Sequence, residues 1–225
     1  MLDQNYLLTA GHVVDLRSRG ALCIPTTDGV SPLEGGLGGN ELGPTEDRRD
    51  DKYDVAYIRL SSKLSAIAHP TFEPLPRQNV DLRGNVLPGD FCSIGGYPIT
   101  QGDRIDASYR SAAYSYVGIA AEHEEYSRLG YDPAIHLMIN YHIKKGIFPE
   151  GDRTNPPHPR GLSGGGIFRL QSDFLVAREA APRHLIGSMH TFLRRENCFI
   201  GTRILGHLLL IEKRFPHEVQ AFAEA

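Results

Sequence analysis

Glycine and proline divide this chain into short apolar segments, and that division is the strongest constraint on its fold. There are 24 Gly and 15 Pro among 225 residues. Short apolar runs bounded by such turn residues favour β-strands over helices. Tyr6 to Ala10 is one such run, and in Asp54 to Leu60 apolar side chains fill one face of an alternating pattern. We therefore predict an all-β chain with a sandwich or barrel architecture.

Helical spacing is clear only near the C-terminus. From Thr202 onward apolar residues recur three or four positions apart, with Thr202 as the predicted N-cap and a break or restart at Pro216. The residues that form this pattern are Ile204, Leu205, Leu208, Leu209 and Ile211. The long segment from Pro25 to Lys52 is instead rich in glycine and polar residues, and we predict a loop there.

The composition argues against several classes of partner. A net charge of -3 provides no basic surface for nucleic acid. The apolar run from Ile204 to Ile211 is far shorter than the roughly 20 residues that cross a bilayer, and the N-terminus lacks the pattern of a secretory signal. Cys23, Cys92 and Cys198 cannot all pair within one chain, which favours a reducing compartment. We expect a cytoplasmic protein that binds neither nucleic acid nor membranes.

Three separate motifs contain residues suited to nucleophilic catalysis. Ser163 lies within the glycine-rich segment Gly161 to Gly166, where the backbone can approach a substrate closely. Serine becomes a good nucleophile only beside a base, and that base needs a third group to orient it. His12 directly follows one predicted strand, and Asp54 stands at the start of another. These three side chains are therefore the candidates for nucleophile, base and orienting acid.

The same motifs resemble those of chymotrypsin-like (trypsin-like) serine peptidases, in the family's order of His, Asp and Ser. Leu8-Thr9-Ala10-Gly11-His12 is similar to the histidine signature, the segment from Asp54 to Leu60 to the acid motif, and Gly161-Leu162-Ser163-Gly164-Gly165 to the nucleophile motif. Gly96-Tyr97-Pro98 and Pro159-Arg160-Gly161 resemble intracellular bacterial members. The resemblance implies two six-stranded Greek-key β-barrels followed by a helix. We place the N-terminal lobe at residues 1–80, the C-terminal lobe at 81–201 and the terminal helix at 202–225.

The resemblance also implies a role for each site residue. Ser163 would attack a peptide carbonyl, His12 would transfer the proton and Asp54 would orient His12. The N–H groups of Gly161 and Ser163 would form the oxyanion hole. The substrate would be an extended polypeptide and no cofactor or metal would be needed. The residues expected to contact the substrate are Pro157, His158, Ser188, Met189, His190 and Thr191, with His190 on the wall of the specificity pocket.

Some features depart from the family pattern. Only 11 residues precede His12, so we expect the first barrel to be incomplete, with a partner or an upstream segment completing it. Pro157 replaces the acid that selects basic side chains in trypsins, which disfavours cleavage after Arg or Lys. Leu162 replaces the Asp that pairs with a newly cut N-terminus in secreted members.

Two other functions stay open. Gly161-Leu162-Ser163-Gly164-Gly165 also fits the nucleophile elbow of α/β-hydrolases, which requires a helix after the serine and a later Asp and His. Alternatively, the chain is a pseudopeptidase, a catalytically weak or inactive protein that uses the peptidase fold to bind peptides.

Overall fold

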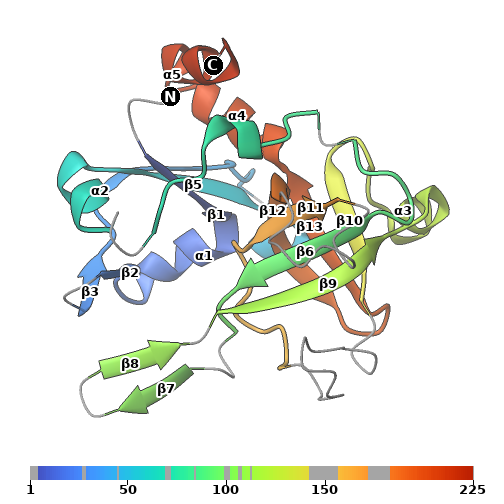
Figure 1. Cartoon of the computed structure of the whole chain (residues 1–225), viewed down its shortest axis with the longest axis horizontal. Coiled ribbons are helices and arrows are strands. Elements are labelled where there is room, and N and C mark those ends of the chain that lie inside the picture. The colour runs from blue at the N-terminus through green and yellow to red at the C-terminus, as the bar shows by residue number, and fades with distance from the viewer. Residues whose placement is uncertain are drawn as a thin grey trace.

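Strands predominate in the protein, as the spacing of Gly and Pro predicts (Figure 1). The computed structural model describes residues 5–26, 29–44, 46–68, 72–83, 85–98, 102–105, 108–111, 113–141, 157–171 and 183–224. The strands are β1 (Tyr6–Ala10), β2 (Cys23–Thr26), β3 (Gly29–Pro32), β4 (Gly35–Gly39), β5 (Val55–Leu60), β6 (Phe91–Gly96), β7 (Gly102–Ile105), β8 (Ser108–Ser111), β9 (Tyr114–Ala120), β10 (His136–Asn140), β11 (Gly166–Leu170), β12 (Arg183–Leu193) and β13 (Cys198–Arg203).

The helices are short and connect the strands. They are α1 (Gly11–Asp15), α2 (Ser62–Ala68), α3 (His123–Leu129), α4 (Ile204–Glu212) and α5 (Pro216–Glu224), with 3₁₀ turns η1 (Leu16–Ser18), η2 (Arg48–Asp50) and η3 (Arg77–Asn79). No helix in the described part of the chain is long and apolar enough to cross a membrane.

Six strands close into a barrel in the order β10-β13-β12-β11-β6-β9. Its interior is apolar because side chains alternate between the two faces of each strand. In β9, for example, Tyr116 and Ala120 are buried whereas Val117 and Ile119 face outward. The buried residues that fill the barrel include Cys92, Ile94, Leu137, Ile139, Ile167, Ile186 and Phe199.

The described strands before residue 80 form a sheet and a hairpin. β1, β5 and β4 make a three-stranded antiparallel sheet, and β2 pairs with β3 in a separate hairpin. A second core lies here, formed by Ile24, Ile58, Leu60, Leu64 and Ala68. The described residues thus contain one closed barrel, and among them neither a second barrel nor the predicted Greek-key topology is confirmed. The division at residues 80 and 201 stays a prediction.

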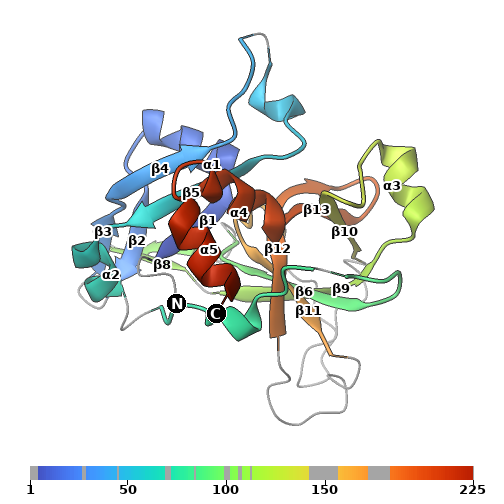
Figure 2. The same ribbon diagram turned by 90° about the horizontal axis from the view of Figure 1, so that it is seen from above.

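Helix α4 packs against β5 of the first sheet and against β12 of the barrel, as seen from above in Figure 2. His207 of α4 is fully buried, with Nδ1 at 3.2 Å from the carbonyl oxygen of Ala56 in β5 and Nε2 at 2.6 Å from the hydroxyl of Ser188 in β12. A carbonyl can only accept, so Nδ1 carries the proton and the hydroxyl donates to Nε2. The imidazole therefore joins both parts of the fold in its neutral form.

Three predictions about local structure are wrong. Thr202 is the fifth residue of β13 rather than an N-cap, because it pairs with both β10 and β12, and its hydroxyl donates to the carbonyl of Tyr53. Arg203 precedes α4 and provides no side-chain cap. The segment predicted as a loop from Pro25 to Lys52 contains β3, β4 and η2. Helices are also not confined to the C-terminus, since α1, α2 and α3 lie earlier in the chain.

Candidate active site

The pairing of β1 with β5 brings His12 beside Asp54. The strands run antiparallel with Ala10 opposite Val55, so the residues that follow β1 meet the residue that precedes β5. The N–H of Gly11 donates to the carbonyl of Asp54 at 3.0 Å, which continues the ladder by one bond. The first turn of α1 then carries the His12 side chain over Asp54.

Asp54 holds His12 by two hydrogen bonds. Its Oδ2 lies 2.5 Å from Nδ1 of the imidazole, and its Oδ1 accepts the backbone N–H of His12 at 2.8 Å. The carboxylate side chain is only 5% exposed, whereas the His12 side chain is 39% exposed. Because Nδ1 faces a carboxylate, it bears the ring proton, and Nε2 is left as a proton acceptor on the accessible side.

A tight turn presents Ser163. Its backbone is fixed by hydrogen bonds from Gly165 N to Leu162 O (2.8 Å) and from Gly164 N to Met189 O (2.7 Å). Gly164 has a φ of 87°, and a Cβ there would lie 2.3 Å from Oγ1 of Thr9 in β1. Glycine is therefore required at this position, and it lets the turn pack directly on the strand that leads to His12. Buried Leu162 anchors the turn in the barrel core.

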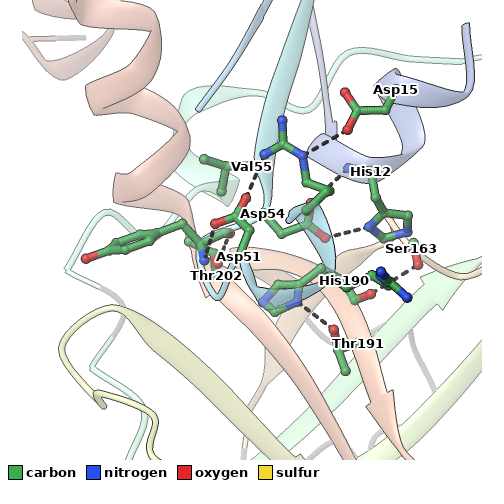
Figure 3. A network of polar contacts seen from close by, with 12 residues as sticks. His12, Asp15, Asp51, Asp54, Val55, Ser163, His190, Thr191 and Thr202 are labelled. Carbon is green, nitrogen blue, oxygen red and sulfur yellow. Dashed lines mark hydrogen bonds and ion pairs between the residues drawn. The ribbon is translucent and has the colours of Figure 1, made fainter. Parts of the chain in front are cut away.

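Ser163 and His12 are neighbours, but the serine hydroxyl is turned toward another group. In Figure 3 the Ser163 side chain lies beside the His12 ring, and its hydroxyl donates to the backbone carbonyl of His190 at 3.2 Å. Among the described residues no hydrogen bond joins Ser163 to His12. In ligand-free sites such bonds are often long or poorly aligned and tighten when substrate binds.

The N–H groups predicted to form an oxyanion hole both lie on this turn. Gly161 has a φ of 94° and, like Ser163, its backbone N–H donates to no other described residue. Among the described residues these two N–H groups therefore have no acceptor, and both could donate to a negatively charged oxygen.

Two of the predicted substrate contacts are buried in the structure. Ser188 and Met189 are buried, and their backbones pair with Gly166, Gly165 and β13 within the barrel. The Ser188 hydroxyl is in addition occupied by His207. Both residues are therefore closed to solvent in the structure. Beyond Met189, no described strand pairs with the edge of β12 that faces away from β13.

His190 is also more enclosed than predicted. Its side chain is buried, Nδ1 contacts the hydroxyl of Thr191 at 3.0 Å, and Nε2 has no partner among the described residues. Burial lowers the pKa of His190 to about 4, so the ring is neutral near pH 7. The side chain predicted to line the specificity pocket is therefore a buried, neutral imidazole in the structure. Thr191 is half-buried on the open part of β12.

The remaining candidates lie before the Ser163 turn. The carbonyl of Pro157 accepts the Tyr116 hydroxyl at 2.7 Å, which ties this segment to the barrel. His158 is exposed, and its ring meets Phe192 edge-on with centroids 6.2 Å apart. Sequence reasoning missed the aromatic cluster behind this segment, although the alternation of Tyr114 and Tyr116 in one strand could have indicated it. The cluster comprises Tyr114, Tyr116, Tyr141, Phe192 and Phe199.

The structure offers little for a metal. The described residues contain no group of three or more His, Cys, Asp or Glu side chains arranged to hold an ion.

The elbow of an α/β-hydrolase requires a helix immediately after the serine, whereas Ser163 is followed by the strand β11. The α/β-hydrolase alternative is therefore wrong.

Comparisons with known proteins identify the fold alone. No family model matches the chain, and no curated protein does. A solved structure of GrC (granzyme C), a chymotrypsin-like protease, matches with a TM-score of 0.54 and 17% sequence identity, over 95% of this chain and 84% of that one. The closed barrel and this similarity together define a chymotrypsin-like fold.

Proposed function

We propose that the chain is a serine endopeptidase that cleaves extended polypeptides through an acyl-enzyme intermediate. One observation carries this proposal: a buried carboxylate, Asp54, holds Nδ1 of His12 at 2.5 Å, and the other face of that imidazole adjoins Ser163. The similarity to a chymotrypsin-like protease supports a hydrolase at the level of the fold.

The geometry leads to a definite order of steps. The Ser163 hydroxyl rotates away from the His190 carbonyl, gives its proton to Nε2 of His12 and attacks the peptide carbonyl carbon. The resulting oxyanion accepts hydrogen bonds from the N–H groups of Gly161 and Ser163. His12 then returns the proton to the departing amine, and a water molecule hydrolyses the acyl-enzyme by the same route. Asp54 stabilises the imidazolium in both halves of the reaction.

Substrate would bind along β12 as an added strand. Beyond Met189 no described strand pairs with the edge of β12 that faces away from β13, and the His190 carbonyl on it accepts only the Ser163 hydroxyl among the described residues. An extended peptide that pairs with Thr191 would run past the nucleophile with its backbone held by main-chain hydrogen bonds. Thr191, Pro157 and His158 are then the predicted contacts that remain available to substrate.

A second candidate function is peptide binding without catalysis. The Ser163 hydroxyl is engaged by the His190 carbonyl in the structure, and the first sheet is open at its edges. A pseudopeptidase would retain the β12 binding edge and never align Ser163 with His12.

A fluorophosphonate probe distinguishes these functions. The peptidase hypothesis predicts labelling of the wild-type chain, no labelling of Ser163→Ala, and labelling of His12→Ala slowed by about three orders of magnitude or more. Circular dichroism of each variant checks that it is folded. A folded wild-type chain that stays unlabelled, yet binds peptides from an immobilised library, would refute the peptidase hypothesis and support the binding module.

A further inference from the structure

Arg48 lies at the centre of a polar network that includes Asp15 and Asp51, both labelled in Figure 3 near the His12–Asp54 pair. Its Nε donates to Oδ2 of Asp15 at 2.9 Å, and its Nη1 donates to Oδ2 of Asp51 at 2.6 Å and to Oδ1 of Asn40 at 2.9 Å. The Arg48 side chain is 19% exposed and that of Asp51 only 3%. The Arg48 guanidinium therefore joins its own loop, through Asp51, to the end of α1 and to Asn40.

Each partner of Arg48 is adjacent to a residue of the proposed triad. Asp15 is the last residue of α1, the helix that carries His12. The side-chain oxygen of Asn40 accepts the N–H of Val55, which directly follows Asp54, at 3.2 Å. Asp51 precedes Asp54 by three positions. Burial acts to raise the pKa of Asp51, but hydrogen bonds from Asn40, from the Asp54 backbone and from Arg48 outweigh it and hold the pKa below its usual value.

Gly11 leaves just enough space for Arg48 to approach Asp54. A Cβ on Gly11 would lie 2.9 Å from Nη1 of Arg48 and 3.0 Å from Oδ1 of Asp54. The guanidinium and the carboxylate therefore face the same small volume. Asp54 has a φ of 41°, a left-handed conformation that non-glycine residues seldom adopt, so its backbone must be held in place by its neighbours.

We infer that Arg48 is a positioning residue, which fixes the Asp54 carboxylate against His12 and ties the loop before β5 to helix α1. The inference rests on the proposed function. An arginine is suited to this role because its planar fork binds several acceptors at fixed angles, which a lysine ammonium cannot do. A displacement of about 1 Å in a catalytic group can cost about two orders of magnitude in rate.

The test compares Arg48→Met and Arg48→Lys with Arg49→Met. Arg49 is a matched control because its side chain is 87% exposed and pairs only with neighbouring Asp47 among the described residues. The first readout is the proton NMR signal of the His12 Nδ1–H, which a short bond to a carboxylate moves far downfield. This NMR readout needs no catalysis.

The second readout is the rate of fluorophosphonate labelling as a function of pH. The titratable and charged groups near His12 are Asp54, Asp15, Asp51, Arg48 and His190.

We expect Arg48→Met to lose or shift the downfield signal and to slow labelling by about tenfold to a hundredfold. Arg48→Lys should recover part of both, and Arg49→Met should match the wild type. Gly11→Ala provides a second perturbation that keeps Arg48, and it should reproduce the loss because its methyl group enters the space between Arg48 and Asp54. If Arg48→Met does not fold, Arg48→Lys decides the question, because it leaves the surroundings of Asp54 free of new atoms.

Wild-type signals and wild-type labelling rates in both Arg48→Met and Gly11→Ala would overturn the inference. A wild-type chain that never reacts with the probe, but whose downfield signal responds to these substitutions, would refute the proposed peptidase function and leave the positioning role of Arg48 intact.

Discussion

The buried imidazole of His207 should make the stability of the protein depend on pH in a measurable way. Burial lowers the pKa of His207 from 6.5 to about 4, although the hydrogen bond with the Ala56 carbonyl acts in the opposite direction. Between these values the unfolded chain binds a proton that the folded chain excludes. Stability therefore falls as the pH drops through 6.5 and levels off below about 4. The pKa difference corresponds to about 3 kcal/mol of unfolding free energy.

The variant His207→Gln isolates this contribution. At pH 7.5 it should be less stable than the wild type by about 1 to 3 kcal/mol, because Ser188 or Ala56 loses a buried partner. Toward pH 4.5 this deficit should shrink or reverse, since glutamine does not titrate. His190, whose pKa is also lowered to about 4 by burial, is present in both proteins, so its effect cancels.

Urea unfolding curves recorded between pH 4.5 and 7.5 would provide the comparison. His217→Gln is the matched control, because His217 lies exposed on α5, the next helix. If His207→Gln and the wild type lose stability in parallel as the pH falls, His207 is not a neutral buried imidazole in solution and the argument for its role as a link between the two cores fails.

Two further substitutions test the site. Asp54→Asn should reduce the fluorophosphonate labelling rate by about four orders of magnitude, since the amide stabilises the wrong tautomer of His12; a rate like that of the wild-type chain would contradict this. Gly164→Ala should destabilise the fold by about 3 kcal/mol in thermal denaturation, because its φ is 87° and its Cβ would meet Thr9. Gly20→Ala, where a Cβ meets nothing within 4 Å, should leave the melting temperature unchanged.

Local pattern was sufficient to predict strands whose side chains face a core. β1 has the predicted bounds because its apolar run ends at Gly11. β4, with the sequence Gly-Gly-Leu-Gly-Gly, has no intrinsic preference for strand. It is a strand because it pairs with β5, and Gly38 is needed there because a Cβ would lie 2.4 Å from the Tyr57 ring.

Short helices escaped prediction for a related reason. α1 has five residues, which is too short to show a helical spacing of apolar residues. Its N-cap, Ala10, provides no side-chain hydrogen bond, so the sequence has no capping signal either. Thr202 had the chemistry of an N-cap, but pairing of β13 with both β10 and β12 extended the strand past it. At Thr202, tertiary pairing therefore outweighed local preference.

The candidate site shows the same division between local and distant information. His12, Asp54 and Ser163 could be selected from motifs because each lies in a recognisable local context. Arg48 could not, since its partners Asn40 and Asp15 are 8 and 33 residues away and no local spacing connects them. The burial of Ser188 and Met189 likewise depends on which strands close the barrel, a property of the topology rather than of any motif.

The central claim is that His12 and Asp54 activate the hydroxyl of Ser163 within one site. A crystal structure of the protein after reaction with a small phosphonofluoridate tests this most directly. The account predicts phosphorus bonded to Oγ of Ser163, its free oxygen within hydrogen-bond distance of the Gly161 and Ser163 N–H groups, and Nε2 of His12 facing the adduct. An unmodified Ser163 with the imidazole turned away, or an adduct on a different side chain, would contradict it.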